Sequence, residues 1–146
     1  MKKGLFRAKS AITGEWVYGY LFYLAEDTEY EEAYILKYVD QRESVYDIWK
    51  YAERIDPETI GEFTGLLDKE GNKIFEDDIV ETKFGRLCFV TWFSSVHTVG
   101  WDLSCIYTSK NLSKKAPQSY DLFAQCNLKV VGNAYDNREF WEEGQS

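Results

Sequence analysis

Alternation of side chains with a period of two predicts β-strands along most of the chain. The strongest case is the segment 15–24, where both faces carry apolar or amphipathic residues. The large side chains on one of its faces are Trp16, Tyr18, Tyr20, Phe22 and Leu24. A strand that is apolar on both faces is typical of a sheet interior, so we expect this strand to be buried on both sides, with Gly19 allowing a bulge or a sharp bend.

Shorter strands are expected on both sides of this segment. They cover residues 5–8, 33–39, 79–83, 86–93, 99–103, 120–125 and 128–131. Residues 10–14 read as a turn, Phe84 and Gly85 as a tight hairpin, and Gly132 and Asn133 as the turn after the last strand. The strand 86–93 is again apolar on both faces, which favours a closed or covered sheet.

A central hairpin is the clearest local signal. Two apolar pairs, at 66–67 and 74–75, flank turn-forming residues. Asp68 at the first turn position can accept a hydrogen bond from the backbone amide two residues later, and Gly71 can adopt the positive φ of a type I turn with a G1 bulge. These residues predict a β-hairpin.

Two segments carry helical signals. In 45–55, apolar residues follow helical spacing. Near the C-terminus, Asn137 can cap a final helical turn that runs through Trp141, with Glu139 in its first turn.

The central segment also resembles a known family. Residues 57–80 read P-E-T-I-G-E-F-T-G-L-L-D-K-E-G-N-K-I-F-E-D-D-I-V, which resembles the core signature of the YopX family of small phage and prophage proteins. F-R-A at 6–8 and V-V-G-N-A-Y-D-N at 130–137 fall where that family has flanking signatures. Asp77 stands where the family usually has glycine, although Asp tolerates the left-handed conformation. The resemblance implies a mainly β fold, an unknown biochemical role and no catalytic residues to carry over. It also implies an extended strand instead of a helix in 45–55, just before the central motif, and we expect strand character near the C-terminal end of that segment.

Length and composition agree with one β-rich domain. The chain has 146 residues, of which 45% are hydrophobic and 17% aromatic. We therefore expect a single YopX-like domain over residues 1–146. Its predicted fold is mainly β, a small barrel or sandwich of antiparallel hairpins with one or two short helices, and an α+β fold is the alternative.

Net charge and hydropathy bear on the partners and the cellular location that we expect. The net charge of −8 disfavours nucleic-acid binding because an acidic surface repels phosphates. The longest apolar run, residues 18–25, is shorter than the roughly 20 residues that span a bilayer. No apolar segment follows the basic N-terminal residues before Arg7, so we expect a protein of the bacterial cytoplasm.

No catalytic or metal-binding pattern emerges. His97 is the only histidine, and Cys88, Cys105 and Cys126 lack C-x-x-C spacing, so buried thiols are expected rather than disulfides or a zinc site. The acids at 76–78 suggest a cation site, but a calcium loop counted from Asp68 would put a lysine where glycine is needed, which favours a solvated turn. Nucleotide-binding motifs are also lacking. We expect no enzyme activity, no metal and no cofactor.

Three functions stay open. The leading hypothesis is a non-enzymatic module that binds a host or phage protein, since Tyr and Trp are abundant and favoured at interfaces. The alternative is a small barrel that binds single-stranded nucleic acid, with bases stacking on Tyr107 beside Lys110, Lys114 and Lys115. The third is homo-oligomer formation through a strand edge or an exposed aromatic patch.

Overall fold

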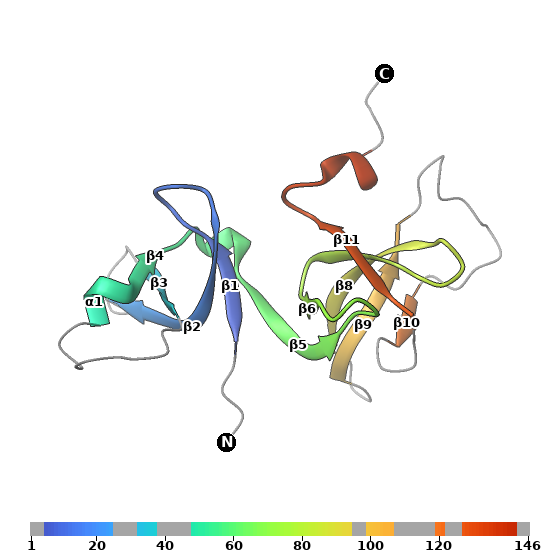
Figure 1. Ribbon diagram of the computed structural model, residues 1–146, viewed down its shortest axis with the longest axis horizontal. Coiled ribbons are helices and arrows are strands. Elements are labelled where there is room, and N and C mark those ends of the chain that lie inside the picture. Colours follow the sequence, from blue (N-terminus) through green and yellow to red (C-terminus); the bar gives the residue numbers. More distant parts are fainter. Residues whose placement is uncertain are drawn as a thin grey trace. The chain divides into compact units, whose positions relative to one another are not determined.

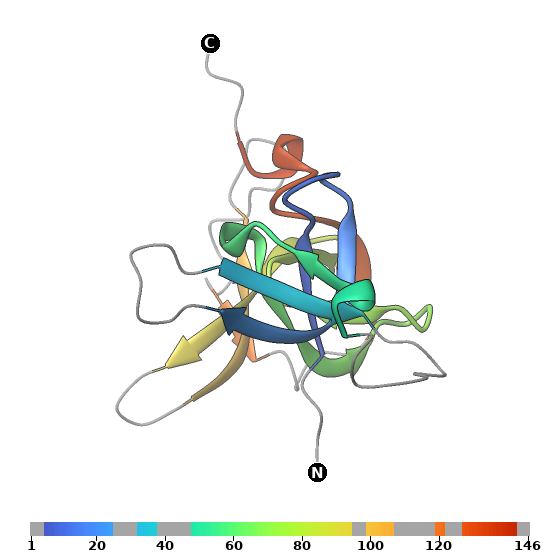
Figure 2. The same ribbon diagram turned by 90° about the vertical axis from the view of Figure 1, so that its left-hand side faces the viewer.

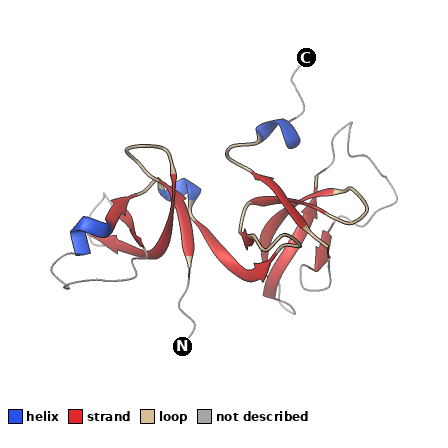
Figure 3. Cartoon of the chain, in the orientation of Figure 1, coloured by secondary structure: helices blue, strands red, loops and turns tan. Residues whose placement is uncertain are grey.

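A computed structural model describes residues 5–24, 32–37, 48–94, 99–106, 119–121 and 127–142 (Figure 1). Strands dominate these residues, and each helix is a single turn (Figure 3). The chain divides into two compact units, Met1–Phe63 and Thr64–Ser146, called unit 1 and unit 2 below. The predicted mainly β class of antiparallel hairpins is confirmed, whereas the prediction of a single domain stays a prediction.

Unit 1 is built on an antiparallel sheet with the order β4-β3-β2-β1-β5. Its strands are β1 (Phe6–Lys9), β2 (Trp16–Leu24), β3 (Glu32–Lys37), β4 (Ala52–Arg54) and the start of β5 (Gly61–Leu67). Figure 2 shows β3 in cyan beside β2 in blue. Helix α1 (Ile48–Tyr51) leads into β4, and the 3-10 turn η2 (Pro57–Thr59) leads into β5. The ambiguous segment thus contains both a helical turn and the expected strand.

Contacts join the end of β1 to the end of β4, the two outer strands of the β4-β3-β2-β1 part of this sheet. Ser10, just after β1, forms an antiparallel bridge with Ile55, just after β4. The Ala11 amide donates to the Arg54 carbonyl over 2.9 Å. The hydroxyl of Thr59, in η2, accepts a hydrogen bond from the Lys9 amide over 2.8 Å. These contacts use backbone groups that would otherwise point away from β1 and β4.

Gly19 lets strands β2 and β3 approach each other closely. A Cβ built there would overlap the carbonyl group of Leu36. The backbone of Gly19 also has φ of +158°, which side chains other than glycine rarely adopt. Neither ladder of β2 has a register shift, so the suggested bulge is absent, and Gly19 is the residue at which pairing passes from β1 (residues 16–19) to β3 (residues 19–24). Close backbone approach is the reason for glycine there.

The core of unit 1 is small. Its buried hydrophobic residues are Ala8, Ala33, Ile35, Leu36 and Ile55, and all but Leu36 form one cluster. The prediction that β2 is buried on both faces is wrong, because Tyr18 and Tyr23 are exposed and Gly19 is its one buried residue. An alternating pattern shows which side chains share a face, but it does not show whether other elements are present to cover that face.

Unit 2 holds the second sheet, with the order β10-β9-β8-β7-β11. Its further elements are β6 (Lys73–Phe75), β7 (Asp78–Glu81), β8 (Leu87–Ser94), β9 (Val99–Cys105), β10 (Ser119–Asp121), β11 (Lys129–Asn133) and the 3-10 turn η4 (Arg138–Phe140). Strand β6 neighbours β5, whose later residues belong to this unit. The tight hairpin at Phe84 and Gly85 is confirmed, with the Gly85 amide donating to the Thr82 carbonyl over 2.9 Å.

Strand β11 continues further than expected. A register shift between Val130 and Gly132 takes up one residue, and pairing resumes through Asn133. The predicted turn at Gly132 and Asn133 is therefore wrong. The side chain of Asn133 accepts the amides of Tyr135 and Asp136 over 3.0 and 2.9 Å, so its turn-forming effect begins after the strand.

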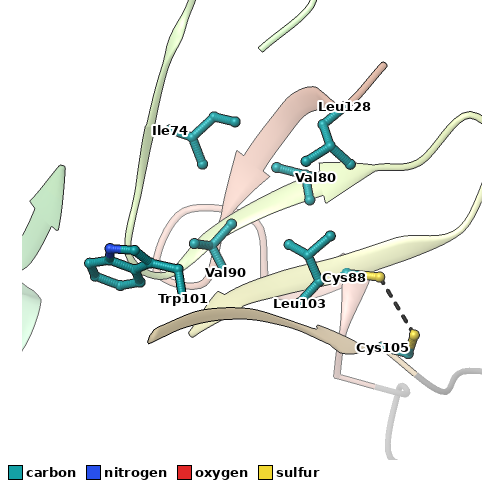
Figure 4. Close-up of a cluster of buried hydrophobic side chains, with 8 residues drawn as sticks. All are labelled: Ile74, Val80, Cys88, Val90, Trp101, Leu103, Cys105 and Leu128. Atoms are coloured by element: carbon teal, nitrogen blue, oxygen red, sulfur yellow. Dashed lines mark hydrogen bonds between the residues drawn. The ribbon is translucent and has the colours of Figure 1, made fainter. Parts of the chain in front are cut away.

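The core of unit 2 is larger (Figure 4). Its members are Ile74, Val80, Cys88, Val90, Trp101, Leu103, Cys105 and Leu128. Cys88 and Cys105 are buried thiols, as expected, and Cys126 lies outside the described residues. Burial and the neighbouring Cys105 raise the pKa of the Cys88 thiol above its ordinary value.

The central hairpin has the predicted turn. The Gly71 amide donates to the Asp68 carbonyl over 3.0 Å, and Gly71 has φ of +86°. The Asp68 carboxylate accepts the amides of Glu70 and Asn72 over 2.9 and 2.8 Å. It also accepts the amide of Val130 in β11 over 3.0 Å, a long-range contact that the local pattern did not predict. Asp68 therefore joins the hairpin to the last strand of unit 2.

The acidic turn at 76–78 is only partly solvated. Asp77 adopts φ of +68°, as its position at the glycine of the family signature requires, and accepts a hydrogen bond from the Tyr135 hydroxyl over 2.8 Å. Asp78 is buried and accepts the Phe75 amide over 2.8 Å, so the expectation of a solvated turn is wrong for this residue. Within the described part of the chain, no three His, Cys, Asp or Glu side chains gather as a metal site would require.

The helical elements are short throughout the described residues. The expected C-terminal helical turn is present as η4, with Glu139 in its first turn. Its cap differs from the prediction, because the Asn137 side chain accepts the Asn133 amide over 3.1 Å instead of an amide of η4. Of the helices in the described ranges, none combines the length and apolar character needed to cross a membrane.

Candidate protein-interaction surface

Three aromatic side chains meet on the face of the unit 1 sheet that points away from its core. Phe22 in β2 and Tyr34 in β3 are paired across the strands, and their rings stack with centroids 5.5 Å apart. The Trp49 ring from α1 meets both edge-on, with centroids 6.4 Å from Phe22 and 5.7 Å from Tyr34. Phe22, Tyr34 and Trp49 are called the aromatic surface below.

The local fold explains why these rings meet. Ile35 points into the core, so its neighbour Tyr34 points to the opposite face, and the paired residue Phe22 does the same. The helix α1 runs directly into β4, which pairs with β3 through Tyr34 and Arg54. That short connection places Trp49 over the two strands.

A polar rim lies beside the rings. The Tyr34 hydroxyl donates to Glu32 over 2.6 Å, and the guanidinium of Arg54 lies 3.9 Å from the other oxygen of the same carboxylate. The hydrogen bond to Glu32, followed by burial, raises the pKa of the Tyr34 hydroxyl above its ordinary value. Tyr34 therefore stays protonated at neutral pH and contributes a fixed donor to the rim.

Trp49 is the exposed member of the aromatic surface. Its exposed fraction is 58%, whereas Phe22 and Tyr34 are half-buried. Covering the remaining surface of a tryptophan this exposed would be worth on the order of 3 kcal/mol. The arrangement can bind an apolar group through Trp49 while Glu32 and Arg54 meet polar groups at the rim.

Besides Trp49, the exposed aromatic residues of the described chain are Tyr18 and Tyr23 in unit 1 and Phe84 and Trp92 in unit 2. Phe84 stands at the tip of the β7–β8 hairpin with the ammonium of Lys83 5.0 Å from its ring centroid. Trp92 is 50% exposed and meets Trp101 edge-on, with centroids 5.0 Å apart. Trp92 thus offers a matched control for Trp49, in residue type and in exposure.

A basic and aromatic site lies elsewhere on unit 1. The guanidinium of Arg7 is 4.6 Å from the ring centroid of Trp16, and the ammonium of Lys9 is 5.5 Å from it. Tyr18, two residues along β2, is exposed on the same strand face. Arg7 itself is buried, so Lys9 and the exposed Tyr18 are the cation and the aromatic ring that a single-stranded nucleic acid would meet here.

The residues predicted for nucleic-acid binding are not placed by the structure. Tyr107, Lys110, Lys114 and Lys115 lie outside the described residues, and so does His97. The structure therefore neither brings these side chains together nor separates them. Cys88 and Cys105, which the sequence predicts to be buried thiols, are both inside the core of unit 2.

Comparison with known proteins settles the relationship. The sequence model of the family described as YopX protein matches residues 5–142. The chain belongs to the YopX family. The YopX match includes both units and confirms the resemblance carried by the central and flanking signatures.

No curated protein matches the YopX chain. Among solved structures, it is similar to the crystal structure of protein EF1440 from Enterococcus faecalis, with 21% sequence identity and a TM-score of 0.46. That alignment covers 95% of this chain and 98% of the other.

The aromatic surface of this YopX chain was only partly visible in the sequence. Alternation placed Phe22 on one face of its strand, and the segment 33–39 was recognised as a strand containing Tyr34. Trp49 is one of the apolar residues at helical spacing in the segment 45–55, and nothing in that spacing places it beside Phe22 or Tyr34. One feature of the sequence could have located Trp49. The helical turn that contains it runs directly into β4, and because β4 pairs with β3, Trp49 must lie close to β3.

Proposed function

We propose that this YopX protein is a non-enzymatic protein-interaction module that binds its partner through the aromatic surface of unit 1. The single observation that carries the proposal is the exposed Trp49 ring, held edge-on by Phe22 and Tyr34. The partner is a protein of a bacterial host or a phage, in the cytoplasm, which is the setting that the resemblance implies.

The composition of the surface supports a protein partner. Interface energy is concentrated in a few aromatic or arginine residues surrounded by polar groups that exclude water. Trp49 supplies the exposed ring, and Glu32 and Arg54 supply opposite charges at the rim. A fitting partner offers an apolar side chain for Trp49 and one donor and one acceptor for the rim.

A comparison of two tryptophans tests the proposal. The protein, Trp49→Ala and Trp92→Ala would each be immobilised and exposed to lysate of phage-infected bacteria, and captured proteins would be quantified by mass spectrometry. We expect at least one protein to be retained by the unchanged chain and by Trp92→Ala but depleted roughly tenfold or more by Trp49→Ala, as for a hot spot of about 2 kcal/mol. The purified partner would then be titrated against the same three proteins.

Equal capture by all three proteins would contradict the proposal, because binding would then not depend on Trp49. Capture of the chain itself would instead indicate self-association, the third hypothesis. Light scattering over a range of concentrations separates that case, since a homo-oligomer gives a mass of at least two chains without any lysate protein.

Single-stranded nucleic-acid binding is the second candidate. It is favoured by the Arg7, Lys9 and Trp16 contacts beside the exposed Tyr18. This candidate predicts that a fluorescent oligonucleotide binds more weakly as salt rises and that Tyr18→Ala weakens binding, since stacking on an aromatic ring is worth about 1–3 kcal/mol per base. Replacing Lys110, Lys114 and Lys115 together by alanine tests the loop proposed from the sequence.

A further inference from the structure

Two buried thiols face each other across strands β8 and β9. Cys88 and Cys105 are directly paired in the register, and their sulfur atoms are 3.6 Å apart (Figure 4). The next pair along the ladder is hydrogen-bonded, since the Ile106 amide donates to the Leu87 carbonyl over 3.0 Å. Hydrogen-bonded and non-hydrogen-bonded pairs alternate in an antiparallel ladder, so Cys88 and Cys105 occupy a non-hydrogen-bonded pair.

That position is compatible with a covalent bond between the sulfurs. Non-hydrogen-bonded pairs have Cα atoms about 4.5 Å apart, within the range of about 4.4–6.8 Å that disulfides span. The sulfurs can close to bonding distance by side-chain rotation, without a change of register. We propose that Cys88 and Cys105 form an oxidation site, in which a small-molecule disulfide converts the two thiols into a reversible cross-strand disulfide.

The reaction balances by thiol–disulfide exchange. One cysteine loses its proton, and its thiolate attacks a sulfur of the oxidant, breaking the S–S bond and releasing one small thiolate. The second cysteine, after losing its proton, attacks the protein sulfur of the mixed disulfide and releases the second small thiolate. The two protons go to the two released thiolates, so the protein loses two hydrogens and the oxidant is reduced to two thiols.

Exposure determines which sulfur reacts first. Cys88 is fully buried, and Cys105 retains an exposed fraction of 7% near the end of β9. Burial also disfavours the thiolate of Cys88. Cys105 therefore attacks first and Cys88 resolves the mixed disulfide. The product joins β8 to β9 within the core of unit 2 and stabilises that unit against unfolding.

Peptide mapping gives a direct test. No lysine or arginine lies between Arg86 and Lys110, so trypsin leaves Cys88 and Cys105 in one peptide, 87–110, and places Cys126 in another, 116–129. The native protein would be incubated with oxidised glutathione, blocked with iodoacetamide and digested without reductant. We expect peptide 87–110 to lose about 2 Da through a bond within the peptide, to regain it with dithiothreitol, and the oxidised protein to unfold at a higher temperature.

A shifted pair provides the control. In Cys88→Ser with Val90→Cys, the number of cysteines and the tryptic peptide stay the same, but the new thiol faces Leu103 instead of Cys105. This variant should form the internal bond at least tenfold more slowly. Equal rates would overturn the proposal, because oxidation would then reflect unfolded chain. Three other results would also overturn the proposed disulfide: the native protein stays reduced, it retains bound glutathione, or peptide 87–110 becomes linked to peptide 116–129.

Discussion

The two units place their large apolar side chains in opposite ways. Two of the four residues in the buried cluster of unit 1 are alanines, while the opposite face of its sheet carries Phe22, Tyr34 and the exposed Trp49. Unit 2 buries isoleucine, valine, leucine, cysteine and tryptophan in one cluster. Because burial of apolar area is the main source of folding energy, unit 2 gains more from its core, whereas unit 1 leaves aromatic area exposed at Trp49.

Unit 1 depends more on specific polar contacts. Ser10 donates to the Glu53 carboxylate over 2.6 Å, and Lys37 lies 3.4 Å from the other carboxylate oxygen. The hydrogen bond from Ser10 is the main reason that the pKa of Glu53 is below its ordinary value. The comparison indicates that the stability of unit 1 depends mainly on backbone geometry and hydrogen bonds, whereas the stability of unit 2 depends mainly on the packing of its core.

The largest effect is expected at Gly19. Gly19→Ala should destabilise unit 1 by about 3 kcal/mol or more, because the methyl group meets the Leu36 backbone and the backbone is strained for any other residue. Gly100→Ala in β9 is the control, since its Cβ meets nothing within 4 Å, and should change stability by less than about 1 kcal/mol. Urea unfolding followed by circular dichroism measures the loss of stability in both variants. Similar losses would show that the close backbone approach at Gly19 does not determine the stability of unit 1.

A smaller loss is expected when Asp68 is replaced by alanine. Removing the carboxylate leaves the amides of Glu70, Asn72 and Val130 without this acceptor, at a cost of about 2–3 kcal/mol. Hydrogen exchange measured on individual peptides shows the loss of protection separately in each unit. If the chain is one cooperative domain, as predicted, protection falls in both units, and loss confined to residues 64–146 would contradict that prediction.

Asp68 also predicts a pH dependence. Burial opposes its ionisation, but the amides of Val130, Asn72 and Glu70 and the Asn72 side chain together lower the pKa of its carboxyl below the ordinary value. The stabilisation is therefore complete above about pH 4, the unfolded-state value, and is lost as pH falls through the folded-state pKa. The stability difference between the protein and Asp68→Asn should shrink between pH 7 and pH 3 in urea titrations. A constant difference would show that ionisation of Asp68 contributes nothing.

The smallest effect on stability is expected at the exposed tryptophans. Trp49→Ala and Trp92→Ala should each cost about 1 kcal/mol, because each removes edge-on ring contacts but little buried area. Thermal unfolding of both variants checks this value. A loss at Trp49 as large as that expected for Gly19→Ala would mean that the aromatic surface acts as a second core of unit 1.

Local turn chemistry was predictable from the sequence. Asp68 and Gly71 identify the central hairpin because the turn needs an acceptor and a positive φ within a few residues. The family signature led to the left-handed Asp77 in the same way. Features that depend on residues far apart were missed, such as the contact of Asp68 with Val130 and the meeting of Trp49 with Tyr34.

The burial of side chains could not be predicted from the alternating pattern. Both faces of β2 are apolar, yet Tyr18 and Tyr23 are exposed, since periodicity carries no information about what packs on a face. Asn133 was assigned to a turn because of its residue type, although a bulge keeps it in β11. Residues 107–118, which include the predicted nucleic-acid site, lie outside the described chain and leave that prediction untested.

The bridge between Ser10 and Ile55 has a consequence for aggregation. A three-residue terminal strand such as β4 normally exposes backbone groups that another chain can extend into a shared sheet. Here the Arg54 carbonyl is already occupied by the Ala11 amide. The part of this edge at Arg54 is therefore closed to strand addition by another chain.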